Sequence, residues 1–363
     1  EKQLGLKSKR DIEDKVGIAK FVEAARANVF RYKAEWEKFT RRIGYWLDLE
    51  HAYMTMSSDY IETLWWIIKE IWKKKLLYQD FKVVPWCTRC GTALSSHELA
   101  QGYERVKDRS VYVRFRIKAK SKEWANTSIL SWTTTPWTLP GNVALAVNPK
   151  ADYVCVPDPE QKGHWLVLGQ ESFNALIGKG VFPPEYRNRT MLDDIDVFSG
   201  KELIGIEYEP IFAVKELRSP KAHRIYPADF VTMAEGTGVV HTAVMYGEDD
   251  YRLGKKEGLP MFHTVDQSGH FLKALGEGLG GLFVKDKKTE EHIVASLKRR
   301  GLLFKEELYE HDYPFCWRCE APLLYYAREG WWVKVTAKRK ALIANNEKIN
   351  RIPEHLKHGR FGE

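Results

Sequence analysis

Two Cys-x-x-Cys pairs, far apart in the chain, constrain its fold more than any other sequence feature. The four cysteines of these pairs are Cys87, Cys90, Cys316 and Cys319. The ten-residue segments around the pairs, PWCTRCGTAL at 85–94 and PFCWRCEAPL at 314–323, align without a gap. Two similar turns that each offer two thiolates can supply all four sulfur ligands of one tetrahedral zinc ion. Such a site has no open position, so the pattern predicts a structural metal centre.

Two other interpretations of these cysteines stay open. One is a redox pair of the thioredoxin type, and the other is a set of unligated thiols. A redox motif needs a single pair, however, so two matched copies of one segment favour a shared metal. Cys155 has no matching partner and is expected to be a buried strand residue.

The two pairs lie on either side of the long middle region of the chain. If they share one ion, the chain leaves a first domain, builds a second and then returns to where it left. That topology is an inserted domain held at its neck by a metal. Closing so long a loop costs chain entropy, and metal binding offsets this cost.

Hydrophobic periodicity divides the chain into a helical beginning and a strand-rich middle. Apolar residues recur at helical spacing in 18–39 and again in 58–77, where Ser58 or Asp59 is the expected N-cap. The expected buried face of the second helix consists of Ile61, Leu64, Trp65, Ile68, Ile71 and Trp72. The middle region predicts strands at 111–117, 129–133, 143–147, 153–156 and 165–168. It also predicts helices at 171–177, 249–257 and 289–300.

Composition is that of a globular protein with a moderate excess of basic residues. Lys and Arg number 57 against 49 Asp and Glu, and the resulting net charge of +8 suits an RNA partner. No apolar run approaches the roughly 18 residues that a membrane span needs. Five cysteines in 363 residues do not indicate a secreted disulfide scaffold, so we expect a cytoplasmic protein.

Several segments resemble the isoleucyl-tRNA synthetases of class I. These segments are GYWLD at 44–48, WTTTPWTLPGN at 132–142, GTGVVH at 236–241, GEDDY at 247–251 and PFCWRC at 314–319. His241 and the acidic run after Gly247 favour the isoleucyl over the valyl subfamily, whose editing domain remains the alternative. The family's ATP-binding signatures His-Ile-Gly-His and Lys-Met-Ser-Lys-Ser are absent. This chain is therefore not expected to aminoacylate tRNA by itself, and ATP with Mg²⁺ would serve only the full-length enzyme.

The resemblance implies a mixed α/β and strand-rich fold with a division into four parts. Residues 1–84 would be a helical piece of a Rossmann-type catalytic domain, and 85–104 with 307–330 would form the zinc-binding neck. Residues 105–306 would form a β-barrel-like editing domain with peripheral helices. Residues 331–363 would return toward the catalytic domain.

The resemblance also implies a second site that removes a wrongly attached amino acid. An aliphatic pocket gains only roughly 1–3 kcal/mol from one methylene, and the handling of valine by this very family is the standard illustration. The implied partner is the 3′ end of tRNA(Ile) carrying valine, bound by a monomeric enzyme with structural Zn²⁺. A non-catalytic zinc module that only binds tRNA is the alternative function.

Asp250 and His241 are the side chains that the resemblance assigns to recognition of the amino acid. Asp250 would hold the α-ammonium group, although an acidic residue here could instead simply favour a helix N-terminus. His241 would line the pocket and exclude isoleucine by size, although a lone strand histidine is more often a satisfied core residue. A general-base role for His241 is the weaker alternative.

The threonine peptide would hold the ester and the attacking water. The residues assigned to this part of the site are Trp132, Thr133, Thr134, Thr135 and Gly238. The threonines could be plain strand residues, but their hydroxyls alternate in direction, so at least one can reach the ribose or the water. With neither a catalytic triad nor an open metal position, direct hydrolysis by a positioned water is expected. In the run 242–246 the family's usual Pro is missing, so Met245 is expected to affect the pocket.

Overall fold

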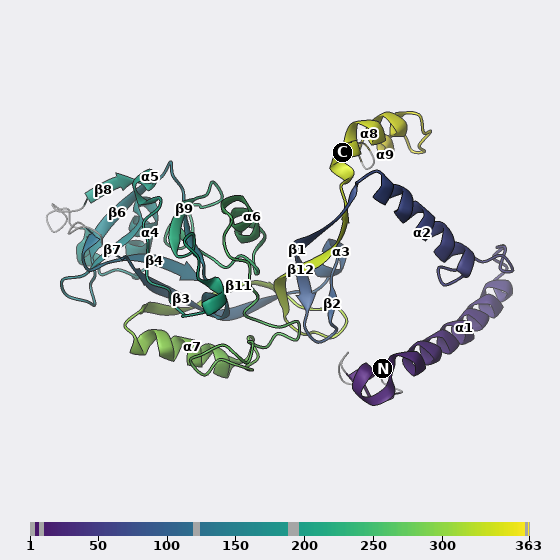
Figure 1. Ribbon diagram of the computed structural model, residues 1–363, viewed down its shortest axis with the longest axis horizontal. Coiled ribbons are helices and arrows are strands. Elements are labelled where there is room, and N and C mark those ends of the chain that lie inside the picture. Colours follow the sequence, from purple (N-terminus) through teal and green to yellow (C-terminus); the bar gives the residue numbers. More distant parts are fainter. Residues whose placement is uncertain (1–3, 7–10, 119–123, 188–195, 360–361, 363) are drawn as a thin grey trace. The chain divides into compact units, whose positions relative to one another are not determined.

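A computed structural model gives the structure of the chain and describes residues 4–6, 11–118, 124–187, 196–359 and 362 (Figure 1). The chain separates into two compact units. One unit comprises Glu1–Lys82 and Arg328–Glu363, and the other comprises Val83–Ala327. None of the described helices combines the length and the apolar character that crossing a bilayer requires.

The first unit is mainly helical in its described residues. Its helical elements are η2 (Ile12–Val16), α1 (Ile18–Arg42), α2 (Ser58–Lys73), η8 (Val335–Lys338), α8 (Arg339–Glu347) and α9 (His355–Gly359). Both helices predicted from periodicity are present. The predicted cap was wrong by one residue, because the hydroxyl of Ser57 accepts the hydrogen bond from the Tyr60 amide at 3.3 Å. No sheet of a nucleotide-binding domain occurs in the described part of this unit, and that assignment stays a prediction.

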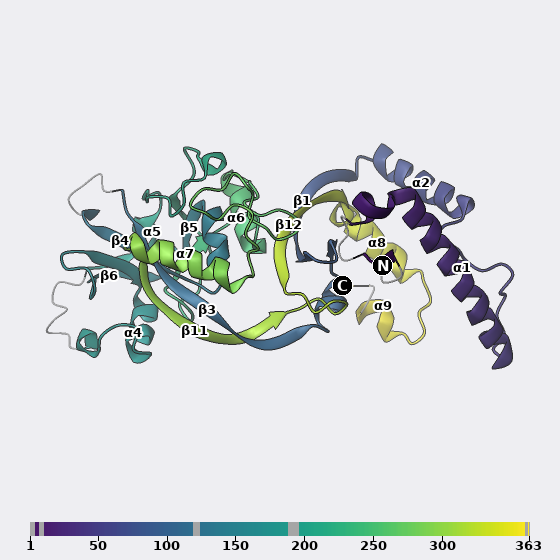
Figure 2. The ribbon, with the colours of Figure 1, turned by 90° about the horizontal axis from the view of Figure 1, so that it is seen from below.

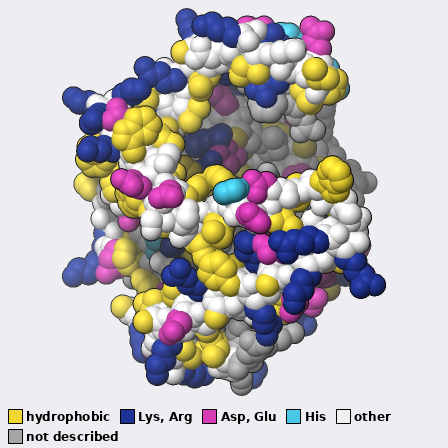
Figure 3. All heavy atoms as spheres, turned by 90° about the vertical axis from the view of Figure 1, so that its right-hand side faces the viewer, with side chains coloured by type: hydrophobic (Ala, Val, Ile, Leu, Met, Phe, Trp, Pro, Cys, Tyr) yellow, Lys and Arg dark blue, Asp and Glu magenta, His cyan; other side chains and the backbone are white. Residues whose placement is uncertain are grey.

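The apolar stripe of α2 is exposed, which contradicts the predicted buried face. No residue of α1 or α2 is buried, and Trp65 and Trp72 are 64% and 60% exposed. The stripe exists in the sequence, but the described chain leaves most of it uncovered. Figure 3 shows hydrophobic side chains interspersed with Lys and Arg on the face that it draws.

A small three-stranded sheet carries the cysteine turns. Its strands are β1 (Leu77–Cys87), β2 (Thr92–Ala93) and β12 (Leu323–Val333), in the order β12-β1-β2, and the helix α3 (Ser96–Leu99) follows β2. Strands β1 and β2 are antiparallel, with Cys87 opposite Thr92. The first cysteine turn is thus the tip of a hairpin, and the second precedes β12.

The second unit is built on a six-stranded mixed sheet in the order β11-β3-β4-β7-β6-β8. Its strands are β3 (Tyr103–Arg116), β4 (Thr127–Thr133), β6 (Asp152–Pro157), β7 (Trp165–Gly169), β8 (Asp196–Ser199) and β11 (Leu303–Pro314). The pair β4–β7 is parallel and the other pairs are antiparallel. The strands predicted from alternation are present, and Cys155 lies on β6 as expected, although it is only partly buried.

A second sheet of this unit has the order β10-β5-β9, with β5 antiparallel to β10 and parallel to β9. Its strands are β5 (Ala144–Val147), β9 (Arg224–Pro227) and β10 (Val239–Thr242). The described strands thus form separate open sheets. The predicted barrel-like body is not seen, because the strand order of neither sheet closes on itself.

Helices lie around these sheets. The longer ones are α4 (Gln170–Gly178), α6 (Glu248–Glu257) and α7 (Lys287–Arg299), and the short ones are η4 (Pro136–Gly141), η5 (Pro184–Arg187), α5 (Gly200–Leu203) and η7 (Lys215–Leu217). All three predicted helices of the middle region are present. Helix α7 runs beside β11 and contacts η4 (Figure 2). Helix α4 packs Phe173, Leu176 and Ile177 into the main hydrophobic core with the strand residues Leu166 and Leu168.

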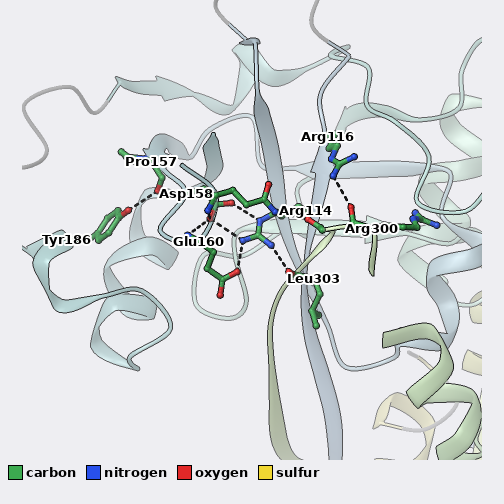
Figure 4. A network of polar contacts seen from close by, with 10 residues as sticks. Arg114, Arg116, Pro157, Asp158, Glu160, Tyr186, Arg300 and Leu303 are labelled. Atoms are coloured by element: carbon green, nitrogen blue, oxygen red, sulfur yellow. Dashed lines mark hydrogen bonds and ion pairs between the residues drawn. The ribbon is translucent and has the colours of Figure 1, made fainter. Parts of the chain in front are cut away.

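A buried ion pair fixes one end of the six-stranded sheet (Figure 4). The guanidinium of Arg114 on β3 donates to both carboxylate oxygens of Asp158 at 2.6 and 3.1 Å, and to Glu160 at 2.7 Å. Arg114 and Asp158 are almost fully buried, whereas Glu160 is half-exposed. A bidentate pair of this kind binds the loop after β6 to strand β3.

Strand β10 approaches β4, which brings the two sheets together. The Ser131 hydroxyl on β4 donates to the carbonyl of Val239 on β10 at 2.9 Å. The residues that follow on each strand, Thr133 and His241, consequently lie in the same region.

Candidate functional site

The residues predicted for the site converge on one cavity of about 330 Å³. Strand β4 ends at Thr133, the peptide continues into η4, β10 contributes His241, and the first turn of α6 contributes Asp250. The predicted residues that line the cavity are Trp132, Thr133, Thr134, Thr135, Gly238, His241 and Asp250. Segments more than 100 residues apart in the sequence are thus brought together, as the sequence predicted.

His241 is held by hydrogen bonds at both ring nitrogens. Nε2 lies 2.8 Å from Thr138 Oγ1, and the Thr138 hydroxyl donates its own hydrogen to the Thr135 carbonyl at 2.8 Å. The Thr138 oxygen therefore accepts from an Nε2–H group, and Nδ1 accepts from the Asn142 amide at 3.4 Å. The orientation of Asn142 is set in turn by bonds to the Ala144 carbonyl and the Tyr208 hydroxyl.

This network makes His241 a neutral and rigid ring. Burial lowers its pKa to about 4, so the ring is uncharged near neutral pH. The lone pair on Nδ1 already accepts a hydrogen bond from Asn142, and the Nε2–H group donates one to Thr138. The arrangement favours a fixed wall of the cavity over a general base, which would need a free lone pair.

The three consecutive threonines differ in their hydrogen bonding. The hydroxyls of Thr133 and Thr135 lie 3.3 Å apart, and Thr133 Oγ1 also accepts from the Thr135 amide at 3.1 Å. Thr135 Oγ1 lies 3.3 Å from that of Thr138. The hydroxyl of Thr134, in contrast, forms no hydrogen bond with any described residue. It is therefore the hydroxyl of the three that remains available to a bound molecule.

Asp250 presents a half-buried carboxyl group to the cavity. One oxygen, Oδ2, accepts from the Ala243 amide at 2.9 Å, and the other has no partner among the described residues. Burial raises the pKa of Asp250 to about 6, although the Ala243 hydrogen bond acts in the opposite direction. A cationic ligand would stabilise the ionised carboxylate here.

Gly238 has a structural reason for its identity. Its φ is +71°, and an added Cβ would lie 2.6 Å from Met233 Sδ and 3.1 Å from the Cα of Gly169. A side chain at this position would push β10 away from the adjoining strand end. Gly238 thus supports the cavity wall through backbone packing.

The four cysteine sulfurs form a compact cluster in the second unit. The Sγ atoms of Cys87, Cys90, Cys316 and Cys319 all lie within 4.8 Å of one another, and Cys87 and Cys319 approach to 3.5 Å. Tetrahedral Zn–S bonds of about 2.3 Å would place the sulfurs about 3.8 Å apart, so the cluster fits one ion. Burial raises the pKa of Cys90 to about 11, and a bound cation would be needed to keep this thiol ionised.

A family model described as tRNA synthetases class I (I, L, M and V) matches residues 1–363. The chain belongs to this family. Curated relatives of this synthetase chain include the isoleucine–tRNA ligases of Clostridium acetobutylicum, 44% identical over 363 residues, and of Thermus thermophilus, 45% identical over 364 residues. Both alignments cover 100% of the synthetase chain and 33% of the relative, so the chain spans about a third of their length. The predicted resemblance to isoleucyl-tRNA synthetases is confirmed.

Two solved structures are distantly similar to part of the synthetase chain. The editing domain of the cytosolic leucyl-tRNA synthetase of P. falciparum is 14% identical with a TM-score of 0.33, covering 55% of this chain and 89% of that one. The corresponding domain of P. knowlesi is 14% identical with a TM-score of 0.32, covering 55% and 86%. Neither likeness supports a functional inference by itself.

Some residues that line the cavity were not found from the sequence. The unpredicted lining residues are Thr138, Phe230, Thr232, Glu235, Gly236, Thr237, Val239, Val240 and Tyr246. Thr138 lies within the quoted peptide, where a polar residue among apolar ones was the available signal. We expected Met245 to affect the pocket, but it is buried and does not line the cavity. The adjacent Tyr246 lines the cavity instead.

Proposed function

We propose that this chain is the proofreading part of an isoleucyl-tRNA synthetase and hydrolyses the ester that joins valine to tRNA(Ile). The supporting observation is the single cavity in which the threonine peptide faces the Asp250 carboxyl group. An aminoacyl ester carries a free ammonium group two bonds from the carbonyl that must be attacked. A carboxylate opposite a row of hydroxyls matches that pattern of charge.

The ammonium group of the substrate would bind at Asp250. The oxygen of Asp250 that lacks a partner is available, and a bound cation would favour its ionised state. The ester and the ribose would then lie along the threonine peptide, with Trp132 on the cavity wall offering an aromatic face.

Selection against isoleucine would come from His241. A neutral ring held at both nitrogens cannot move aside without breaking buried hydrogen bonds to Thr138 and Asn142. Isoleucine exceeds valine by one methylene, which an apolar pocket alone distinguishes by roughly 1–3 kcal/mol. A rigid wall excludes the larger side chain by steric overlap, which is a stronger means of discrimination.

Hydrolysis would use a water held in place by the protein. The free hydroxyl of Thr134 can orient this water, and the hydroxyls and amides of the peptide can stabilise the negative charge that develops on the carbonyl oxygen. His241 would take no proton, because both of its nitrogens are engaged and its pKa is lowered. The water oxygen would form a bond to the carbonyl carbon while the bond from that carbon to the ribose oxygen breaks, and the departing ribose oxygen would take up the proton of the water. Attack by water, rather than by a side chain, leaves no covalent intermediate.

We also propose that the cysteine cluster binds one structural Zn²⁺ ion. Four sulfur ligands, from Cys87, Cys90, Cys316 and Cys319, would complete the coordination of the ion and leave no open position. The ion would therefore hold the segment 85–104 and the segment 307–330 together. The intervening residues 105–306 would then form the editing domain.

Deacylation of Val-tRNA(Ile) by this chain tests the proposed function. We expect hydrolysis by the wild-type chain and a loss of at least about 100-fold for Asp250→Ala, since the variant lacks the ammonium partner. Asp249→Ala is the matched control, because Asp249 is the exposed neighbour and does not line the cavity. A wild-type chain that binds tRNA with strong salt dependence but never cleaves the ester would instead support the non-catalytic zinc module.

A further inference from the structure

A second cavity, of about 420 Å³, is also lined by residues of the threonine peptide. Thr134 lines both cavities, and Pro136 and Trp137, which follow it, line the second one. The basic residues that line the second cavity are Lys107 and Arg109 of β3 and Lys285 and Lys287 around the start of α7. Thr134 is therefore a residue common to the linings of both cavities.

Four of the eight charged residues that line the second cavity form ion pairs with described residues, namely Lys107, Asp108, Arg109 and Glu290. Its lining also includes the acidic residues Asp108, Asp286, Glu290 and Glu291. The pairs are Arg109 with Glu306 at 3.3 Å, Asp108 with His311 at 3.2 Å and Lys107 with Glu310 at 3.6 Å. Lys285 and Lys287 form no ion pair with any described residue. They are the cations of this cavity that remain available to an anionic ligand.

Lys285 is the more constrained of these two cations. Its Nζ lies 3.9 Å from the centre of the Tyr313 ring, in a cation–π contact. Burial lowers the pKa of Lys285 to about 8, although Asp108 and Glu290 act in the opposite direction. A half-buried ammonium group without a carboxylate in contact gains from an anion placed beside it.

The groups of one nucleotide could occupy both cavities, because its ester and its phosphate are attached to different positions of the ribose. In an aminoacylated tRNA the ester is on the 2′ or 3′ hydroxyl of the terminal adenosine, and the 5′-phosphate leaves the ribose on its other side. A ribose held near Thr134, with its ester in the first cavity, would direct its phosphate toward the second. The first cavity is lined by the acidic residues Glu235 and Asp250 and by no described Lys or Arg, so it offers the phosphate no positive charge.

On the basis of the proposed function, we propose that the second cavity binds the 5′-phosphate of the terminal adenosine, with Lys285 and Lys287 contacting its oxygens. Thr134 then marks the point where the substrate passes from one cavity to the other. The phosphate would anchor the ribose, so this cavity contributes to binding rather than to the attack on the carbonyl.

Binding of adenosine 5′-monophosphate, compared with adenosine, tests the phosphate site without any hydrolysis. Titration calorimetry on the wild-type chain should show that the phosphate tightens binding by about tenfold. Lys285→Met, which keeps an apolar stem over Tyr313, should remove this difference, and Lys285→Arg should retain most of it. Lys288→Met is the matched control on an exposed residue outside the cavity. Equal affinities of the wild-type chain for the two ligands would overturn the proposal.

Two valyl esters extend the test to the reaction. For valyl-adenosine, which has no phosphate, Lys285→Met should behave as the wild-type chain does. For the valyl ester of the dinucleotide CpA, the same variant should raise KM by about tenfold and leave kcat nearly unchanged. An equal loss on both esters would contradict a phosphate site. A wild-type chain that hydrolyses neither ester but discriminates the two nucleotides would contradict the proposed function and leave the phosphate site standing.

Discussion

The carboxyl group of Asp250 is poorly stabilised as an anion before a ligand binds. It has one backbone hydrogen bond, from Ala243, and its burial acts against the negative charge. An α-ammonium group would supply both a hydrogen-bond donor and a compensating charge. The ionised carboxylate of Asp250 thus destabilises the free protein, and binding of a cationic substrate would offset this destabilisation.

The stability of an Asp250→Asn variant should show this cost directly. The pKa of Asp250 is raised from 3.8 to about 6 in the folded chain, so the folded state loses stability as the pH rises from about 4 to about 6, and the loss persists above that. We expect Asp250→Asn to be more stable than the wild-type chain at pH 8, by about 2 kcal/mol after allowing for solvent screening. The advantage should vanish near pH 4.

Urea unfolding of both proteins at pH 4 and pH 8 measures the difference. A variant that is less stable than the wild-type chain at pH 8 would show that Asp250 is stabilised as an anion by groups within the protein. In that case the carboxylate of Asp250 would not need a cationic ligand to compensate its charge.

His241 illustrates which residue-level properties a sequence reveals. Its place on a strand and its position in the site followed from the Gly-Thr-Gly turn before it and the family motif. Its tautomer and rigidity depend on Thr138 and Asn142, which are 103 and 99 residues away along the chain. Hydrogen bonds between such distant residues leave no local pattern, so the sequence could not predict them.

At the scale of elements, the start of α6 sets the position of the Asp250 carboxylate. Gly247 is the N-cap of this helix, and a Cβ added there would lie 3.0 Å from Asp250 Oδ2. The backbone of Gly247 has an extended φ of −147°, which any residue adopts. A side chain here would therefore displace the carboxylate without straining the helix.

Gly247→Ala should consequently reduce hydrolysis of the valine ester by about tenfold, since a small misplacement of a binding group is costly. The stability should change by less than about 1 kcal/mol. Gly276→Ala is the control, because a Cβ at Gly276 meets open space. Unimpaired hydrolysis by Gly247→Ala, measured in single-turnover assays, would argue against a positional role for Asp250.

The two cysteine turns have the same backbone geometry. Gly91 and Glu320 follow the second cysteine of each turn, and both have positive φ angles of 62° and 59°. Their amides donate to the carbonyls of Cys87 and Cys316, respectively. The two turns therefore share one backbone conformation although their residues at this position differ. Binding of one ion by both turns would require this shared conformation.

Removal of the metal should destabilise the second unit. We expect about one zinc ion in each purified chain and a fall in the unfolding temperature of roughly 10 °C after chelation, restored when zinc is added. Cys319→Ser should lower the zinc content, whereas Cys155→Ser, outside the cluster, should not. Elemental analysis that finds no zinc in freshly purified protein would instead favour the redox interpretation of the cysteines.

The elements themselves were largely predictable, and their surroundings were not. The helix at 18–42 and the strand at 165–169 follow from residue spacing, which depends on neighbours along the chain. The exposure of Trp65 and the open strand orders depend on which elements pack together. Periodicity specifies that a face is apolar but does not specify what covers it.

At the scale of the whole molecule, all residues of the candidate site lie in the second unit, so the site forms only when this unit is folded. The Arg114–Asp158 pair joins strand β3 to the loop after β6 and is almost fully buried. Breaking a buried pair leaves an uncompensated charge, which is strongly destabilising. We expect Asp158→Ala to lower the free energy of unfolding by about 3–5 kcal/mol.

Glu160→Ala provides the comparison, because Glu160 contacts the same guanidinium but is 55% exposed. Its loss should cost no more than about 1 kcal/mol. Chemical denaturation of the two variants distinguishes these effects, and similar values for both would mean that Asp158 does not compensate the Arg114 charge.

The relation between the two units of the chain bears on its activity. The cavity, the second cavity and the cysteine cluster all lie within Val83–Ala327, and the relatives that match the chain are about three times longer. The residues to which we assign the proposed reaction all belong to this one unit. We therefore expect the chain to hydrolyse the valine ester selectively although it spans only about a third of these relatives.

The proposed function requires that the cavity between the threonine peptide and Asp250 accepts valine and rejects isoleucine. Single-turnover deacylation of Val-tRNA(Ile) and Ile-tRNA(Ile) by the wild-type chain tests it most directly. We predict that the valine ester is hydrolysed at least about 100-fold faster, since a rigid wall adds to the limited discrimination of an apolar pocket. Equal rates for the two esters, or no hydrolysis of either, would contradict the account.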